Sequence, residues 1–250
     1  MRDSQTAIIR LKRKVLKIPL SFSACKEIIR EKKNFPEVLR DSHFSKFFLK
    51  GCFLGGIILC NPYLRPAKRE SGDIDLIKKY FKMSFRDFRD WEIKKIKEII
   101  EYKYFLDFVF ENIAEDQSFW SDYLLRIGIP CSSSHGDFHL DNILLKDNNL
   151  FFIDWIRYRK FSSRLFDLID FYIFYNKNSS QSWMDFWFEE FRLDREIIYD
   201  IEIEKNYFLA YAVWKVSEEL KTLVLRGKLS KQKRKKYINF LKEIKNNLNE

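Results

Sequence analysis

The stretch from residue 132 to residue 155, SSSHGDFHLDNILLKDNNLFFIDW, limits most strongly what this chain can fold into. Its apolar runs are interrupted by Asp147, Asn148 and Asn149. These residue types form tight turns, so the stretch predicts a strand, a turn and a second strand. Two of the chain's three histidines and four aspartates also lie here, which is more polar chemistry than a plain hairpin needs.

The ends of this hairpin predict a metal site. If the turn centres on Asn148, antiparallel pairing sets Asn142 opposite Asp154. Neighbouring strands lie about 5 Å apart, so an amide oxygen and a carboxylate can face one spot, as Mg²⁺ prefers. Asp137 stands five residues before Asn142, and this spacing is the layout of a kinase catalytic loop. We therefore predict Asp137 as the catalytic base and Asn142 and Asp154 as metal ligands.

The sequence HGDFHLDN followed by FIDW resembles the aminoglycoside phosphotransferase and choline kinase-like superfamily over residues 135–168. The resemblance implies an α+β, two-lobed protein-kinase-like fold with a small β-rich N-lobe and a larger helical C-lobe. It implies ATP, or GTP, and Mg²⁺ as cofactors and an alcohol group as acceptor. It also implies that His135 and Asp167 support the catalytic loop. Ile156 departs from the pattern, since relatives often carry Gly there.

Three residues of the loop keep more than one interpretation. His139 either touches phosphate or packs inside the protein, and Asp141 is best read as an exposed carboxylate. The alternative to a catalytic site is a plain hairpin with polar ends, in which Asp137 caps a turn and His135 is buried in the core.

A kinase also needs a strand lysine that binds phosphate and a helix glutamate that holds it. The segment VLKIP supplies Lys17, with Lys12 and Lys14 as alternatives on the opposite face of the strand. The partner is Glu27 or Glu31 in a helix that begins near Ser21 and that Pro36 should stop. Residues three or four apart share a helix face, so the sequence does not separate the two cleanly. We favour Glu27 because it leaves a more usual gap before Pro36.

The nucleotide base is expected at the end of a hairpin over residues 47–60, where the chain continues into Asn61-Pro62-Tyr63. In relatives the backbone of this hinge binds the base, so we assign Cys60, Asn61 and Tyr63 to the nucleotide. No glycine occurs before Gly51, so the Gly-rich loop that normally covers the phosphates is shortened or missing. Either basic side chains (Arg10, Lys12, Arg13) cover the phosphates, or the protein is a pseudokinase that acts as a binding or scaffold protein.

The domain boundary is expected in the polar connector 60–73, which gives an N-terminal nucleotide-binding lobe over 1–62 and a helical lobe over 63–250. Apolar residues at intervals of three and four predict helices beyond this connector. The predicted helical segments are 75–83, 88–113, 118–127, 165–175, 182–191, about 195–225 and 237–248.

Composition bears on the partners. The net charge is +10, and the segment 226–236 carries seven basic residues and no acidic one. We expect a small-molecule or sugar acceptor, with a lipopolysaccharide-type sugar favoured, and a peripheral contact with an anionic membrane or glycan through 226–236. No nucleic-acid-binding motif accompanies the charge, so nucleic acid is not expected. The four cysteines are scattered, and neither a signal peptide nor a membrane span is evident, so we expect a cytoplasmic protein, peripheral at the inner membrane.

Overall fold

The computed structural model describes residues 6–99, 101–190, 195–225 and 227–248. The chain forms two compact units. The first contains the N-terminal part through Arg86, Ser133–Lys160 and Asp170–Tyr175, and the second contains Asp87–Ser132, Phe161–Ile169 and the chain from Asn176 onward. The predicted division into lobes 1–62 and 63–250 stays a prediction.

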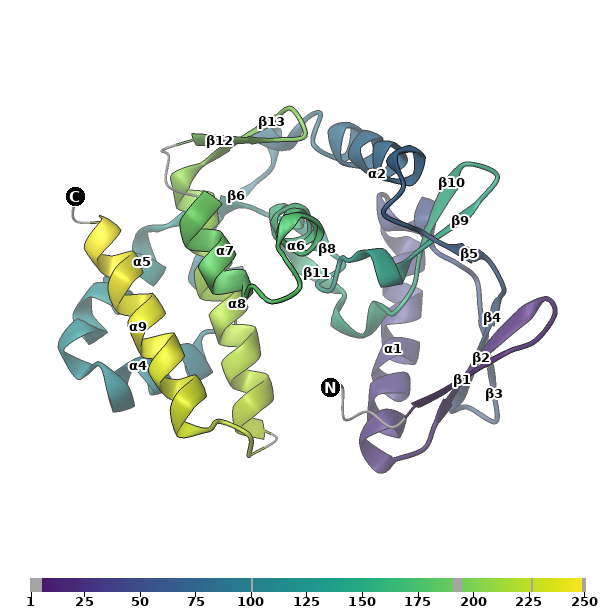
Figure 1. Ribbon diagram of the computed structural model, residues 1–250, viewed down its shortest axis with the longest axis horizontal. Coiled ribbons are helices and arrows are strands. Elements are labelled where there is room, and N and C mark those ends of the chain that lie inside the picture. The colour runs from purple at the N-terminus through teal and green to yellow at the C-terminus, as the bar shows by residue number, and fades with distance from the viewer. Residues whose placement is uncertain (1–5, 100, 191–194, 226, 249–250) are drawn as a thin grey trace. The chain divides into compact units, whose positions relative to one another are not determined.

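Among the described residues, the N-terminal strands form an antiparallel sheet in the order β1-β2-β4-β3 (Figure 1). Its strands are β1 (Thr6–Arg10), β2 (Lys14–Pro19), β3 (Cys52–Leu54) and β4 (Ile58–Pro62). The β3–β4 turn contains Gly55 and Gly56, both at positive φ, which glycine adopts without strain. Both predicted strand regions are therefore confirmed.

Helix α1 (Phe22–Arg40) follows β2 and begins at Ser21, whose side chain accepts a hydrogen bond from the Ala24 N–H. Pro36 lies inside this helix and does not stop it, contrary to the prediction. Contacts of a residue in the last turn and of the C-cap residue hold this end of the helix. Val38 is fully buried, and Asp41 accepts hydrogen bonds from the N–H groups of His43 and Phe44.

A second sheet of the first unit has the order β10-β9-β5, with β9 (Ile143–Lys146), β10 (Asn149–Phe152) and β5 (Arg65–Pro66). Asp147 and Asn148 form its two-residue turn, with φ of 50° and 60°, the pattern of a type I′ hairpin. The register pairs Asn149 with Lys146 and Phe152 with Ile143. The hairpin prediction is confirmed, but the register was one residue wrong, since a two-residue turn sets Ile153, not Asp154, opposite Asn142.

Aromatic side chains make the core beneath this hairpin. They come from the 3-10 helix η1 (Phe44–Phe47), from α2 (Ser71–Ser84) and from the loop around Phe138. The Phe138 ring lies 4.9 Å from that of Phe152 and stacks at 5.6 Å on Tyr80. The segment around Phe138 is therefore held in place by apolar contacts. Its short helices are η4 (Leu140–Asn142) and η5 (Trp155–Arg157).

The second unit is mainly helical. Its elements include η2 (Phe88–Asp90), β6 (Ile93–Lys95), α3 (Ile96–Ile99), α4 (Lys103–Asn112), η3 (Ala114–Asp116), α5 (Gln117–Arg126), β7 (Gly128–Pro130), α7 (Trp183–Glu190), α8 (Lys205–Leu225) and α9 (Lys231–Leu248). The chain further contains α6 (Arg164–Asn176) and the paired strands β8 (Ser132–Ser134) and β11 (Arg159–Ser162).

Two predicted helices are corrected in this unit. The segment 88–113 is broken into short elements, of which β6 pairs with β7. The long helix expected from about 195 begins only at Lys205, because β12 (Arg195–Ile198) and β13 (Ile201–Glu204) form a hairpin before it. Tyr199 and Asp200 turn this hairpin at positive φ. No helix within the described ranges is both long enough and apolar enough to cross a bilayer.

Candidate active site

Lys17 is the centre of a cluster of charges in the first unit. Its Nζ lies 3.0 Å from Glu31 Oε2 and 3.3 Å from Asp154 Oδ1. Burial lowers the pKa of Lys17, but the two carboxylates more than offset this, so the pKa is raised and the lysine stays charged. Lys12 and Lys14, the alternatives considered from the sequence, are exposed.

Glu31, and not the favoured Glu27, is the partner of this lysine. Ala24, Ile28 and Glu31 are all buried and are spaced by four and three residues, so they share the face of α1 that meets the sheet. Glu27 lies one turn before Glu31, at the edge of this stripe, and is only half-buried. The preference for Glu27 was therefore wrong: the two glutamates lie one turn apart on α1, and the position of Lys17 along the helix, which the gap before Pro36 does not reveal, selects Glu31.

Helix α1 also holds the backbone that follows Asp154. Glu31 Oε1 accepts a hydrogen bond from the Trp155 N–H over 3.3 Å. Asn34 Nδ2 donates to the carbonyl oxygens of Trp155 at 2.6 Å and Ile156 at 3.3 Å. Asp154 itself has φ of 65°, so its backbone turns out of the strand direction. Sequence reasoning missed Asn34, although its place three residues after Glu31 on one helix face is a signal that could have found it.

Asn142 is oriented by its amide nitrogen. Nδ2 donates to the Asp137 carbonyl oxygen over 2.8 Å and lies 3.1 Å from His139 Nε2. The backbone N–H of Ile153 donates to the Asn142 carbonyl oxygen over 3.0 Å, which brings Asn142 next to the residue that precedes Asp154. With the amide nitrogen held by the loop, the amide oxygen is the atom left to face a cation.

The Asp137 carboxylate has basic neighbours. His139 Nε2 lies 3.6 Å from Asp137 Oδ2, and Arg157 Nη1 lies 3.8 Å from Asp137 Oδ1. His139 thus lies among polar groups of the loop, while Asp141 is exposed, as expected. The sequence carried no signal for Arg157.

The backbone at Gly136, directly before Asp137, leaves no room for a side chain. Its φ is 78°, and a Cβ added there would lie 2.4 Å from the Arg157 carbonyl oxygen. Only glycine adopts this conformation and leaves this space without strain. The close approach joins the loop that carries Asp137 to the segment that follows Asp154.

His135 is fully buried, and its Nε2 lies 2.8 Å from the Ile153 carbonyl oxygen. A carbonyl only accepts, so Nε2 carries the proton. Burial lowers the pKa of His135, with Asp137 opposing, so the ring is neutral at pH 7. The ring also lies 4.6 Å from that of Trp155. These contacts bridge the loop and the strand that leads to Asp154, as loop support requires. Asp167 is also buried, in the first turn of α6, and its role in the loop stays a prediction.

The predicted hinge continues the β2–β4 ladder. Cys60 is buried opposite Leu16, and the Tyr63 N–H donates to the Arg13 carbonyl oxygen over 3.0 Å. The Asn61 side chain occupies the space beside Gly51, where an added Cβ would lie 2.1 Å from Asn61 Oδ1. Binding of the base by these residues stays a prediction.

The donor set suits Mg²⁺ bound jointly with phosphate. Across the described ranges no three His, Cys, Asp or Glu side chains group as a metal cluster, so a metal cage built by the protein alone is not found there. Asn142 and Asp154 offer oxygen ligands from adjacent backbone positions, and Mg²⁺ commonly takes one or two protein oxygens with water and substrate phosphates.

Comparison with known proteins identifies the fold through solved structures, since neither known protein families nor curated proteins give a match. The chain has the kinase-like fold of small-molecule phosphotransferases, with an antiparallel sheet in its N-terminal part and a larger helical C-terminal part. The structure that carries this conclusion is choline kinase LicA from Streptococcus pneumoniae, with a TM-score of 0.54 at 13% identity. The alignment covers 96% of this chain and 90% of that one, so the predicted fold class is confirmed.

Two further solved structures align at lower TM-scores. A choline/ethanolamine kinase family protein from Mesorhizobium loti gives 0.48 at 12% identity and covers 97% of this chain and 85% of its own. A thermostable mutant of aminoglycoside phosphotransferase APH(4)-Ia gives 0.49 at 10% identity, with coverages of 97% and 92%.

Proposed function

We propose that this protein is a Mg²⁺-dependent kinase that transfers the γ-phosphoryl group of ATP to a hydroxyl group of a small molecule. One observation carries the proposal, namely the Lys17 ammonium held 3.0 Å from Glu31 and 3.3 Å from Asp154. A half-buried lysine held between a helix carboxylate and a second carboxylate is the arrangement that kinases use to bind nucleotide phosphates.

Each residue has a role in this proposal. Lys17 binds the α- and β-phosphates, and Glu31 holds Lys17 in place. Asn142 and Asp154 would hold the Mg²⁺, which neutralises charge on the phosphate oxygens when it is bound. Asp137 orients the acceptor hydroxyl and takes its proton as the acceptor oxygen bonds to the γ-phosphorus. The bond from that phosphorus to the β–γ bridging oxygen breaks, and ADP leaves.

The identity of the nucleotide rests on the hinge. We assign the base to Cys60, Asn61 and Tyr63 and favour ATP, with GTP as the alternative. Because the Tyr63 N–H already donates to Arg13, this donor must exchange partners before it can bind a base. Arg10 shares the face of Lys17 by strand parity, so it is the basic side chain best placed to cover phosphates in place of a Gly-rich loop.

The acceptor is proposed to be a sugar or glycan hydroxyl, with a lipopolysaccharide-type sugar favoured over an aminoglycoside. The net charge of +10 supports an anionic acceptor or an anionic surface around it. The solved structure with the same fold is named a choline kinase, so choline belongs in any acceptor panel. We also propose that the protein is cytoplasmic, with peripheral contact at the inner membrane.

The alternative function is a pseudokinase that serves as a binding or scaffold protein, and the glycine-free N-terminal segment favours it. Thermal-shift measurements with ATP and GTP, with and without Mg²⁺, separate the two. Stabilisation that requires Mg²⁺ supports the kinase, and no stabilisation by either nucleotide contradicts it.

The assignment of the base is tested by ADP release with choline, hexoses, heptoses and aminoglycosides as acceptors. Asp137→Ala should abolish release with the best acceptor while nucleotide stabilisation persists. Unchanged release would contradict the role of Asp137.

A further inference from the structure

One face of the β1–β4 sheet is apolar on all four strands. Lys17 and Leu59 are paired and lie on the face that meets α1. Residues of the other parity point to the opposite face, since side chains alternate along a strand. The ladders pair Ile9 with Leu16, Leu16 with Cys60, and Cys60 with Cys52. We call this the outer sheet face. Its apolar members are Ala7, Ile9, Leu16, Ile18, Cys52, Leu54, Ile58, Cys60 and Pro62, of which Cys60 is buried, and the charged Lys14 lies on the same face at the end of β2.

The outer sheet face is accessible at both of its edges. The exposed fractions are 43% for Ile9 on β1 and 47% for Leu54 on β3. Leu11, at the tip of the β1–β2 hairpin, continues the row with 49% exposed. A sheet face that meets only water carries polar residues, whereas this one carries isoleucine, leucine and cysteine. An exposed apolar surface of this kind marks a site of interaction.

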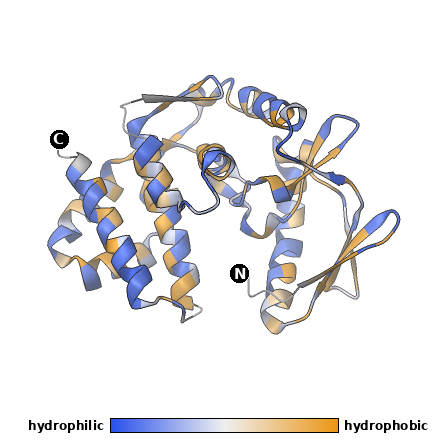
Figure 2. Cartoon of the chain, viewed as in Figure 1, coloured by the Kyte–Doolittle hydropathy of each residue, from blue (hydrophilic) through white to orange (hydrophobic). Residues whose placement is uncertain are grey.

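The charge beside this face is of one sign. Residues 6–19 and 42–69 contain no aspartate or glutamate. The hairpin carries Arg10, Lys12, Arg13 and Lys14, all of them exposed. In Figure 2 the hairpin tip is hydrophilic, and its strands carry hydrophobic segments. A partner must therefore combine an apolar layer with negative charge.

These properties select the partner. A second copy of the chain would bring equal basic tips together, which costs free energy. A nucleic acid would satisfy the charge and leave the apolar face in water. An anionic phospholipid surface satisfies both, because its headgroups attract Lys and Arg while apolar side chains enter the boundary with the acyl chains.

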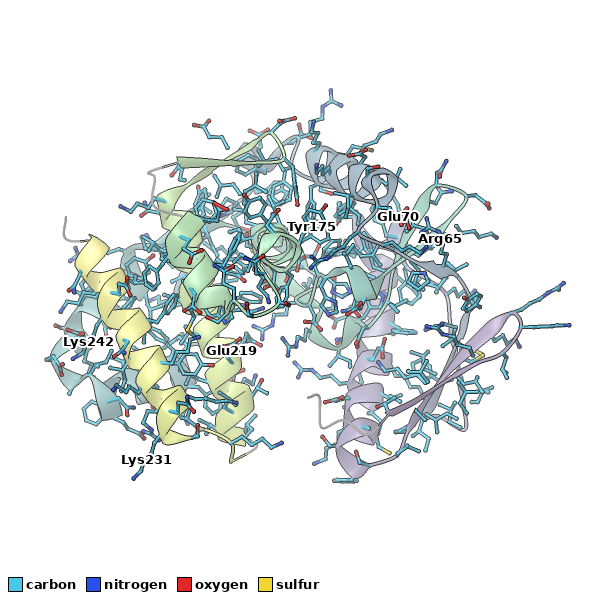
Figure 3. The ribbon with its side chains drawn as sticks, viewed as in Figure 1. Arg65, Glu70, Tyr175, Glu219, Lys231 and Lys242 are labelled. Atoms are coloured by element: carbon cyan, nitrogen blue, oxygen red, sulfur yellow. The ribbon has the colours of Figure 1, made fainter. Side chains whose placement is uncertain are left out.

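The basic segment 226–236 lacks this combination. Arg226 lies outside the described residues. Arg234 lies 3.5 Å from Glu111, and Lys236 lies 3.6 Å from Asp185, so part of the positive charge is balanced within the protein. The apolar residues of α9 are buried, among them Tyr237, Phe240, Leu241 and Ile244. Lys231 and Lys242 extend from α9 (Figure 3), and Lys242 is paired with Glu115 at 2.9 Å.

We propose that the outer sheet face and the basic tip of the β1–β2 hairpin dock the protein on an anionic phospholipid membrane. The inference does not depend on the proposed kinase activity, because binding to a membrane requires no phosphoryl transfer, although Cys60 and Arg10 are also assigned to the nucleotide.

Co-sedimentation with vesicles tests the proposal. The full chain is mixed with vesicles of phosphatidylcholine alone or of equimolar phosphatidylcholine and phosphatidylglycerol. We expect binding to the anionic vesicles only, weakened by salt. Lys12→Glu with Arg13→Glu should weaken binding on the order of 30-fold or more, since each basic residue near the surface contributes about 1 kcal/mol. Leu11→Glu with Leu54→Glu should also abolish it, and both positions are exposed enough to accept glutamate without unfolding the sheet.

The matched control carries the same charge change on α9, Lys231→Glu with Lys233→Glu, and should bind as the wild type does. Equal loss in this control, or equal binding to neutral vesicles, would overturn the proposal. A gel-shift assay with nucleic acid tests the other anionic partner. Binding of nucleic acid that is lost in the Lys12→Glu, Arg13→Glu variant, together with no binding to vesicles, would also overturn the proposal. Sedimentation velocity tests whether a second copy covers the face. If the protein is a dimer that Leu54→Glu dissociates, and it does not bind vesicles, the occupant is a second copy and the membrane assignment is overturned. Circular dichroism confirms that each variant is folded.

Discussion

Glu31 Oε1 accepts a hydrogen bond from the backbone N–H of Trp155 over 3.3 Å, although 124 residues separate the two in the chain. The other oxygen of the same carboxylate lies 3.0 Å from Lys17 Nζ. One buried side chain therefore fixes both the strand lysine and the backbone next to Asp154. In the proposed kinase, the groups that bind phosphate and metal are set relative to each other by this contact.

Replacing Glu31 by glutamine should weaken the binding of MgATP by roughly 10- to 100-fold, because a charged hydrogen bond to Lys17 is lost. Titration calorimetry measures the affinity. Glu27→Gln is the matched control on the same helix and should bind as the wild type does. Equal weakening by the two changes would contradict the assignment of Glu31.

Gly136→Ala should lower the free energy of unfolding by about 2 kcal/mol or more, because the new Cβ meets the Arg157 carbonyl oxygen at 2.4 Å and φ is 78°. Urea unfolding measures the change. Gly72→Ala in the first turn of α2 is the control, since a Cβ there meets no atom within 4 Å. That change should be neutral or stabilise by up to about 1 kcal/mol. Comparable losses at both positions would contradict the close approach at Gly136.

The stability of the protein should fall as the pH drops below about 6.5, and His135 should contribute to this slope. Burial lowers the pKa of folded His135 from 6.5, so the unfolded chain binds the proton more readily. The stabilisation by neutral His135 is therefore present above 6.5 and is lost as the pH falls. His135→Gln keeps a donor for the Ile153 carbonyl but does not titrate, so urea unfolding between pH 8 and pH 5 should give a shallower dependence. An unchanged slope would refute this origin.

Asn34→Ala should destabilise the protein by about 1–3 kcal/mol, because two buried carbonyl groups lose their donor. It should also weaken MgATP binding, since the backbone beside Asp154 is no longer held by α1. Lys33→Ala, the exposed neighbour, should change the free energy of unfolding by less than about 0.5 kcal/mol. Thermal unfolding with and without MgATP measures both effects, and equal behaviour of the two variants would contradict the role of Asn34.

The sequence could predict what depends on local pattern. Apolar runs around turn formers predicted the β3–β4 and β9–β10 hairpins, because a turn and its strands are contiguous in the chain. For β2 the sequence predicted only the strand that carries Lys17, and the structure pairs it with β1 in a hairpin. The spacing from Asp137 to Asn142 and on to Asp154 pointed to the correct class of fold. The same local rules failed at residues 195–204, where apolar spacing fits a helix as well as a hairpin and tertiary contacts decide between them.

By itself, then, the sequence determined the type of fold and the chemistry brought together between His135 and Trp155, while the need for glycine at position 136 follows from the close approach of the Arg157 carbonyl in the structure. Only the tertiary structure decided that Glu31 and not Glu27 meets Lys17, that the hairpin register sets Ile153 opposite Asn142, and that Asn34 holds the backbone after Asp154. On a strand, a residue one position away points to the opposite face, so a shift of register by one residue changes which residues meet. On α1, Glu27 and Glu31 lie one turn apart on a shared face, so the position of Lys17 along the helix decides which of them it meets. Spacing in the sequence predicts which residue types form the site, and the packing of α1 on the sheet decides which glutamate meets Lys17.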